Sequence, residues 1–277
     1  MELYRTTSIS ISKIIAENYS TSFSAGMRLL NKEEKEAIYA IYGFVRIADE
    51  IVDTFHDYDK GALLQEYILE TRRAMERGVS SNPVLHSFQW AVNKYNIGHD
   101  LIDSFFASMK MDLTNHEYPE QEFRQYVHGS AEVVGLMCLA VFYPDNRDYY
   151  NELVPSARKL GEAFQKVNFL RDIRSDKDER GRIYFPILVS RGLDEETKKT
   201  IEEDVGNDFK AALSGIRKLD NRIGLGVYLA YRYYFELYQK IRKKNPAQLL
   251  QSRIRLNGFQ KFILLIGSYL RFRLRLF

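Results

Sequence analysis

Two pairs of aspartates lie one helical turn apart in segments that are otherwise apolar. Asp49 and Asp53 form the first pair, and Asp172 and Asp176 form the second. Residues four apart in an α-helix share a face, with their Cβ atoms about 5–6 Å from each other. Two carboxylates so close repel each other, and burying them without a partner costs several kcal/mol. Each pair therefore predicts a site for a cation.

Each pair continues a polar line along an apolar helix. The side chains stand at offsets 0, 4, 7 and 11 in one line and 0, 3, 7 and 11 in the other, so each line occupies one helical face. The lines consist of Tyr42, Arg46, Asp49 and Asp53, and of Gln165, Asn168, Asp172 and Asp176. The spacing alone is weak evidence, because a solvated acidic face can share it. Its position inside two mostly apolar helices favours a buried site.

The ligand types indicate which cation and which substrate to expect. Ligands that are all oxygen favour Mg²⁺, or Mn²⁺, over zinc. Mg²⁺ usually takes one or two carboxylates and completes its shell with water and phosphate oxygens, so a diphosphate is the natural substrate. Arg46 and Arg171 flank the pairs, and Arg182 lies in a loop at 177–186 that could close over a departing anion. For the loop, the alternative is a plain surface loop. For the carboxylate site, the alternative is a di-iron bundle, but a di-iron site needs Glu-x-x-His pairs that the chain lacks.

Helical periodicity dominates the chain, and no alternating run is bounded by hairpin signals. The pattern predicts helices over 36–56 and 160–176, with Asn31 and Asp194 as N-caps of two helices. The six prolines, at 83, 119, 144, 155, 186 and 246, are expected between helices. We predict about ten helices in a single all-α domain that spans residues 1–277.

Composition and charge exclude several classes of protein. The chain has 277 residues, 45% of them apolar and 28% charged, which excludes wholesale disorder. Cys138 is the single cysteine, so neither an internal disulfide nor a cysteine-based metal site can form. The first residues contain no signal-like segment, and the apolar run at 262–270 is too short to span a bilayer. We expect a cytoplasmic protein without a membrane span.

Basic charge is concentrated in a C-terminal segment, residues 240–277. It contains ten Lys and Arg residues and neither Asp nor Glu. Phenylalanine, leucine and isoleucine are interleaved with these charges, which suits an anionic membrane surface, an RNA, or a solvated helix end packed on the body. We expect peripheral contact with the inner face of a membrane and no nucleic-acid partner.

Four segments together resemble the squalene/phytoene synthase family of head-to-head prenyl transferases. The segment from Leu160 to Pro186 matches the family's second aspartate signature, and Tyr42 to Asp53 resembles its first. Residues 126–135 resemble the middle signature, although Val127 and Glu132 depart from it, and the family often has Tyr where this chain has His128. The segment Ser20-Thr21-Ser22-Phe23 resembles the family's N-terminal signature.

The resemblance implies a helical isoprenoid-synthase fold with a central active-site cavity. It implies that Asp49, Asp53, Asp172, Asp176 and Asn168 hold Mg²⁺ bound to prenyl diphosphates. Diphosphate binding and the lining of the site would fall to Ser20, Ser22, Phe23, Tyr42, Arg46, Gln165, Arg171 and Arg182. Tyr126 and His128 are the candidates for a group near the reacting carbons.

The resemblance to bacterial phytoene synthases favours one product over the others. Two geranylgeranyl diphosphates would couple through a cyclopropyl diphosphate to give phytoene, without NADPH. The alternatives are a squalene or dehydrosqualene synthase that uses farnesyl diphosphate, another cation-forming isoprenoid enzyme, and a non-catalytic assembly factor of the same fold. Because all four aspartates are present, the non-catalytic alternative is disfavoured.

Overall fold

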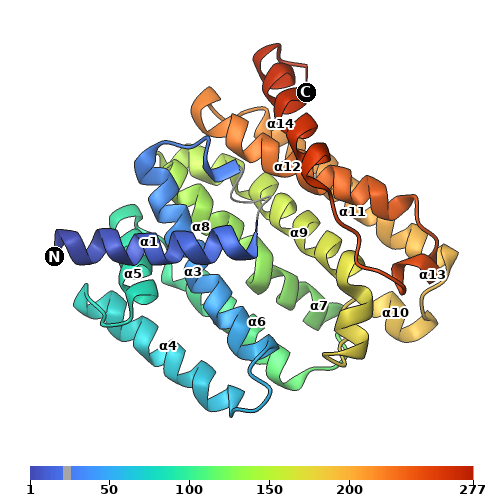
Figure 1. Ribbon diagram of the computed structural model, residues 1–277, viewed down its shortest axis with the longest axis horizontal. Helices are drawn as coiled ribbons and strands as arrows, with labels where there is room; N and C mark the ends of the chain where they lie inside the picture. Colours follow the sequence, from blue (N-terminus) through green and yellow to red (C-terminus); the bar gives the residue numbers. More distant parts are fainter. Residues whose placement is uncertain (21–25, 277) are drawn as a thin grey trace.

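The computed structural model describes residues 1–20 and 26–276. Apart from one isolated bridge between Glu117 and Ile183, the regular structure in these residues is helical, which confirms the predicted all-α fold (Figure 1). The first helices along the chain are α1 (Glu2–Tyr19), α3 (Lys32–Asp53), α4 (Lys60–Arg77), α5 (Pro83–Tyr95) and α6 (His99–Thr114). The later ones are α7 (Glu120–Val127), the π-helical turn η1 (His128–Glu132), α8 (Val133–Phe142), α9 (Arg147–Asp178), α10 (Pro186–Arg191), α11 (Glu195–Ile216), α12 (Asn221–Arg242), α13 (Pro246–Leu249) and α14 (Gly258–Arg273).

Helix α3 carries the first aspartate pair and begins where the sequence predicts. The side chain of Asn31 accepts a hydrogen bond from the backbone N–H of Glu34, which confirms the predicted N-cap. The helix ends at Asp53 rather than at residue 56. At this end the Thr54 hydroxyl donates a hydrogen bond to the carbonyl of Glu50, and such local bonding by threonine competes with continuation of a helix. Asp53 therefore lies at the C-terminal end of α3.

Helix α9 carries the second aspartate pair and is much longer than predicted. It runs over 32 residues and contains Pro155, so the expectation that every proline lies between helices is wrong. Proline lacks the N–H that would bond the carbonyl four residues earlier. Because α9 packs along α8, η1 and α11, its tertiary contacts outweigh the loss of that one hydrogen bond. Gly161 permits the close approach to η1, since a Cβ there would lie 2.5 Å from the carbonyl oxygen of Ala131.

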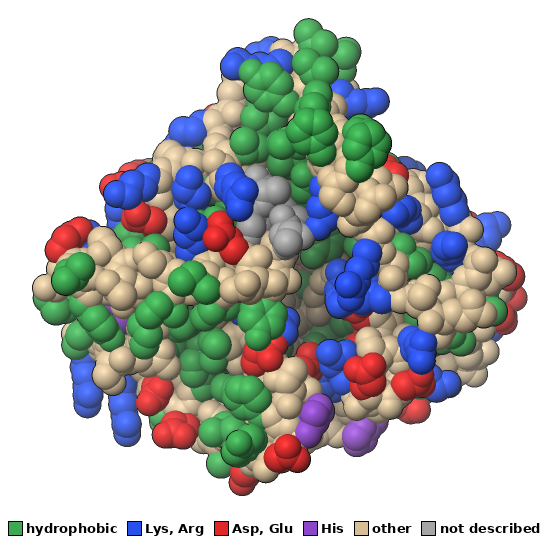
Figure 2. Space-filling model, viewed as in Figure 1, with side chains coloured by type: hydrophobic (Ala, Val, Ile, Leu, Met, Phe, Trp, Pro, Cys, Tyr) green, Lys and Arg blue, Asp and Glu red, His purple; other side chains and the backbone are tan. Residues whose placement is uncertain are grey.

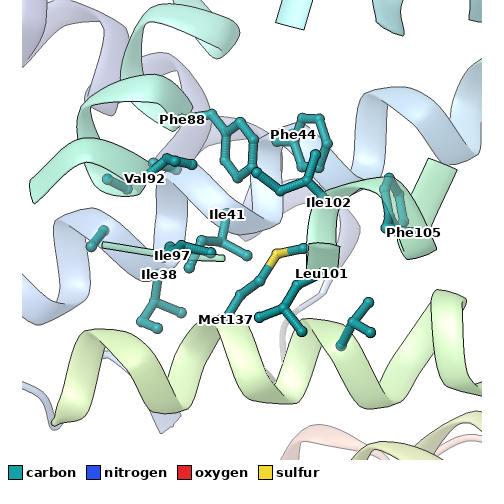
Figure 3. Close-up of a cluster of buried hydrophobic side chains, with 14 of the residues drawn as sticks. Ile38, Ile41, Phe44, Phe88, Val92, Ile97, Leu101, Ile102, Phe105 and Met137 are labelled. Carbon is teal, nitrogen blue, oxygen red and sulfur yellow. The ribbon is translucent and has the colours of Figure 1, made fainter. Parts of the chain in front are cut away.

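The core around α3 fixes the first aspartate pair in place. The rings of Phe44 and Phe88 stack with centroids 3.7 Å apart. Ile41 of α3, Phe105 of α6 and Met137 of α8 belong to the same buried cluster (Figure 3). All of these side chains are nearly or fully inaccessible to solvent. Burial of this much apolar surface holds α3 against α5, α6 and α8.

A second buried cluster fixes the loop that follows α9. Tyr184 stacks on Phe169 with ring centroids 4.1 Å apart, and Phe185 packs edge-on against the same ring. Tyr118 and Tyr126 complete this aromatic group. The chain after α9 is therefore folded back onto α7 and α9.

One described helix is long and apolar enough to qualify as a membrane span by length and composition. It is the continuous helix formed by α7, η1 and α8, Glu120–Phe142, whose apolar window is 67% buried inside the protein. Core helices of this kind pass the same test.

Candidate active site

The two aspartate pairs meet where the C-terminal ends of α3 and α9 converge. Arg180 connects them, because its Nε lies 3.4 Å from Asp53 Oδ2 and its Nη1 donates to Asp176 Oδ1 at 2.9 Å. The C-terminal end of a helix carries a partial negative charge that adds to the charge of nearby carboxylates. Figure 2 shows a hollow in this face of the molecule, with basic and acidic side chains around it. These converging negative charges strongly favour the binding of cations.

The pKa values of three of these aspartates are shifted by burial and by the neighbouring charges. Burial, followed by the charge of Asp53, raises the pKa of Asp49 to about 8. Burial also raises the pKa of Asp176 to about 7, although Arg180 opposes the shift. Asp172 behaves differently: burial acts against its charge, but the adjacent Arg171 holds its pKa below the ordinary value. Two of the four carboxylates thus lack enough positive charge around them.

The donor set fits a hard divalent cation. The ligand atoms available are carboxylate oxygens and the Asn168 side-chain oxygen, which is buried without a hydrogen-bond partner. Oxygen donors of this kind suit Mg²⁺ or Mn²⁺. A cation here would neutralise the carboxylates and give Asn168 Oδ1 a partner.

Arginines surround the carboxylates on several sides. Arg171 donates to both oxygens of Asp172, at 3.0 and 2.5 Å. Arg253, from the segment after α13, reaches the same carboxylate with Nε 2.7 Å from Oδ1. Arg46 pairs with Glu50 and lies 4.1 Å over the ring of Tyr19. The sequence analysis missed Arg253, for which the only signal was the basic character of the C-terminal segment.

Asp112 of α6 is a second residue that the sequence analysis missed. It accepts hydrogen bonds from the hydroxyls of Tyr118 at 2.9 Å, Tyr126 at 2.7 Å and Tyr184 at 3.2 Å. Arg182 donates to the carbonyl of Asp112 at 2.8 Å and to Asp53 Oδ1 at 2.7 Å. Burial raises the pKa of Asp112 to about 6, and Arg182, whose Nη1 lies 3.4 Å from Asp112 Oδ1, opposes that shift. Asp112 therefore anchors both the Arg182 loop and Tyr126.

A cavity of about 250 Å³ extends along α9 away from the carboxylates. Its wall on α9 runs from Gln165, nearest Asp172, through Gly161 and Ala157 to Leu153. The twelve steps of helical rise from Leu153 to Gln165 correspond to about 18 Å. The rest of the wall comes from α3, η1, α8, α11 and α12, with Tyr42 and Gln165 among its few polar residues. The cavity is suited to a long hydrocarbon chain whose charged end lies at the carboxylates.

The comparisons with known proteins agree with this geometry. Residues 16–202 match the family model for squalene/phytoene synthase. The chain belongs to the squalene/phytoene synthase family. It is 27% identical to a phytoene synthase of Arthrospira platensis over 303 residues, covering 97% of this chain and 94% of that protein. It is 28% identical to a 4,4'-diapophytoene synthase of Staphylococcus haemolyticus over 62% of this chain and 59% of that protein. A solved dehydrosqualene synthase superposes with a TM-score of 0.84 at 19% identity, covering 97% of this chain and 98% of that one.

Membership in the squalene/phytoene synthase family makes this chain a prenyltransferase of isoprenoid biosynthesis. The family joins prenyl diphosphates head to head, and its reactions generally depend on a divalent metal. Four residues predicted to bind substrate lie in or beside this site. The cavity wall contains Tyr42 and Gln165, and the carboxylates are contacted by Arg171 and Arg182.

The resemblance to squalene/phytoene synthases singled out further residues, for which the structure gives different results. His128 contacts Glu132, with Nδ1 2.8 Å from Oε2, and Glu132 also accepts a hydrogen bond from Arg158 at 2.6 Å. Within the described residues no hydrogen bond or ion pair joins His128 to the four aspartates. Ser20 ends α1 and shares a side-chain hydrogen bond with Tyr42. Ser22 and Phe23 lie outside the described residues.

A different acidic cluster holds α9 against α11. Carboxylate oxygens of Glu162, Asp204 and Asp208 lie within 4.8 Å of one another, the one such group of three or more in residues 1–20 and 26–276. The buried Lys166 pairs with all three, and Lys159 pairs with Glu162 and Asp208. The two lysines therefore already supply positive charge to the three carboxylates of this cluster. The four predicted aspartates form no group so tight, which suits a metal that takes many of its oxygens from water and substrate.

Replacing Asp112 with asparagine tests its role as an anchor in this squalene/phytoene synthase. The amide keeps the size of the side chain but removes the charge that faces Arg182, so the Arg182 loop should lose its fixed position. We expect kcat for prenyl coupling to fall by about 10- to 100-fold, because the misplacement of one charged group costs this much. Steady-state kinetics would measure it. Asp103→Asn, on the same helix but exposed and paired with Arg72, is the matched control, and equal activity of both variants would contradict the role.

Proposed function

We propose that this enzyme joins two molecules of geranylgeranyl diphosphate head to head to form phytoene. The observation that carries the proposal is the long apolar cavity lined by α3 and α9, the two helices that carry the paired aspartates. The match to a phytoene synthase over nearly the whole length of both chains supports the same product. The reaction is proposed to need Mg²⁺, with Mn²⁺ as a possible replacement, and no NADPH. The site of action is proposed to be the cytoplasm, with the chain acting as a single domain.

The residues of the site account for ionisation of the first substrate. Asp49, Asp53, Asn168, Asp172 and Asp176 would hold Mg²⁺, which would supply Lewis-acid stabilisation of the leaving diphosphate. Arg46, Arg171 and Arg182 donate hydrogen bonds to the same anion as its bond to the allylic carbon breaks and the electron pair moves to oxygen. The diphosphate leaves with its charge neutralised, and an allylic cation remains at the mouth of the cavity.

The cavity wall and the nearby aromatic rings account for coupling. The double bond of the second prenyl diphosphate attacks the cation and loses a proton, which gives a cyclopropyl diphosphate. Loss of the second diphosphate and rearrangement then produce the 1-1′ bond, and loss of a final proton gives phytoene. The apolar wall excludes the water that would otherwise capture either cation. The rings of Tyr42 and Phe164, which line the cavity, and of Tyr126, which Asp112 holds, are the candidates to stabilise positive charge through their faces.

Farnesyl diphosphate is the alternative substrate, with dehydrosqualene or squalene as the product. The similarity to a 4,4'-diapophytoene synthase and to a solved dehydrosqualene synthase favours it. Squalene would in addition require a hydride from NADPH. A non-catalytic assembly factor is disfavoured, because such a protein has no need to keep four aspartates together at the ends of two helices.

One incubation distinguishes these products. The purified full chain is mixed with geranylgeranyl diphosphate and Mg²⁺ without NADPH, and the organic extract is analysed by mass. We expect a C40 hydrocarbon with the mass of phytoene, and its loss when EDTA is added. A C30 hydrocarbon formed only from farnesyl diphosphate would replace the proposed substrate. The absence of hydrocarbon from both substrates, with and without NADPH, would contradict catalysis.

A further inference from the structure

Helix α14 presents an apolar face to solvent. Phe259, Phe262, Ile263, Ile266 and Leu270 recur at helical spacing, and each is between 46% and 72% exposed. The opposite face of the helix, formed by Leu264, Ser268 and Phe272, is buried against the body. Figure 2 shows hydrophobic side chains gathered at the end of the molecule that α14 forms in Figure 1. A helix packed by one face with a second apolar face exposed is typical of a contact surface.

The charges around this face indicate the chemistry of the partner. Arg271 and Arg273 stand in the last turn of α14, and Arg275 follows the helix. From Lys240 onward the chain contains ten Lys and Arg residues and no acidic residue. An apolar face on a segment that carries cations and no acidic residue is complementary to a surface that combines hydrocarbon with anionic groups. A membrane with anionic headgroups has this combination.

The dimensions of α14 specify how it would meet a membrane. Its 16 residues span about 24 Å, which is less than the hydrocarbon thickness of about 30 Å. A helix that is short, charged at its end and apolar on one face lies in the plane of the interface. We propose that α14 holds this enzyme on an anionic membrane surface, with Phe259, Phe262 and Ile266 at the boundary between headgroups and acyl chains.

The position of α12 connects this surface to the active-site cavity. Leu229 and Tyr233 of α12 pack with Leu264 of α14, whereas Val227 and Ala230 of α12 line the cavity. The cavity is therefore separated from α14 by the thickness of one helix, about 10 Å. This geometry keeps a hydrocarbon product close to the membrane. That consequence rests on the proposed function, whereas the membrane contact itself is independent of it.

Vesicle binding by the full chain tests the proposal. Co-sedimentation is measured with vesicles of phosphatidylglycerol and phosphatidylcholine in equal parts, and with phosphatidylcholine alone. We expect the wild-type chain to bind the anionic vesicles and Phe262→Ser/Ile266→Ser to bind them about 100-fold more weakly, since two exposed apolar side chains are removed. Arg271→Gln/Arg273→Gln should lower the same affinity by about 30-fold and reduce its dependence on salt.

Control variants separate membrane binding from folding and from self-association. Leu3→Ser/Ile14→Ser removes two exposed apolar side chains of α1 and should bind like the wild type. Thermal unfolding and prenyl coupling in detergent should be unchanged in Phe262→Ser/Ile266→Ser, which separates loss of membrane contact from failure of the proposed reaction. The proposal is overturned if the wild type does not bind anionic vesicles or if the α14 and α1 variants bind equally. Dissociation of a dimer by Phe262→Ser/Ile266→Ser, with vesicle binding unchanged, would instead assign the face to a second copy of the chain.

Discussion

Replacing Asp49 with asparagine will lower kcat for prenyl coupling by at least about 1,000-fold and make the metal-free protein more resistant to heat. The loss of activity follows from the proposed function, because one carboxylate less would face the cation proposed to stabilise the departing diphosphate, a contribution of about 4 kcal/mol. The gain in stability follows because burial and Asp53 raise the pKa of Asp49 to about 8, whereas an unfolded aspartate titrates near about 3.9. Folding therefore opposes ionisation of this group.

The stability effect has a defined pH dependence. A carboxyl whose pKa is raised on folding costs no stability below its unfolded pKa, and the cost grows as pH rises toward the folded value. The melting temperature of Asp49→Asn relative to the wild type, measured in EDTA, should therefore increase between pH 5 and pH 8. Asp57→Asn is the control, because Asp57 is spaced four residues from Asp53 but is exposed. A variant that keeps full activity, or that melts below the wild type at pH 8, would contradict the assignment.

Replacing Ala157 with phenylalanine will shorten the hydrocarbon chain that the enzyme accepts. Ala157 lines the cavity on α9 between Leu153 at the far end and Gln165 near the aspartates. A phenyl ring there would fill the distal part of the cavity, and each isoprene unit that loses its place forfeits about 0.8 kcal/mol per carbon. We expect kcat/KM to fall by about 100-fold or more for geranylgeranyl diphosphate and much less for farnesyl diphosphate.

Two further variants make the chain-length result specific. Ala211→Phe adds the same ring to an exposed position next to Ala212, which lines the cavity, and it should leave the preference unchanged. Ala157→Leu is a milder change that still narrows the cavity if the phenylalanine variant folds poorly. Competition between the two substrates measures the preference directly. An equal loss of both activities would show that the cavity does not hold the prenyl chain.

The local elements of the site could be predicted from the sequence because helical spacing determines which residues share a face. The lines that contain Asp49 and Asp172 lie on α3 and α9 as expected, and Asn31 and Asp194 cap their helices. Their convergence through Arg180 depends on which helices pack together, and the pattern of one segment does not contain that information.

Long-range partners explain what sequence reasoning missed. Asp112 is a lone aspartate on α6, and its importance comes from three tyrosines and an arginine in other elements. Arg253 lies 81 residues from Asp172, its partner. Pro155 was misplaced for a related reason, since packing along the whole of α9 overrides the local preference of proline. The roles of all the candidate site residues stay predictions, and Ser22 and Phe23 lie outside the described residues.

If the aspartates hold the metal as proposed, the arginines that pair with them make metal and substrate binding depend on each other. Arg180 lies between Asp53 and Asp176, and Arg171 and Arg253 hold Asp172. A divalent ion that arrives alone must displace guanidinium groups that then have no anion to bind. An ion that arrives with a diphosphate supplies that anion, so each ligand raises the affinity for the other by the same factor. The enzyme should therefore remain largely metal-free until its substrate is present, and substrate supply rather than the free Mg²⁺ concentration would set how much of it is active.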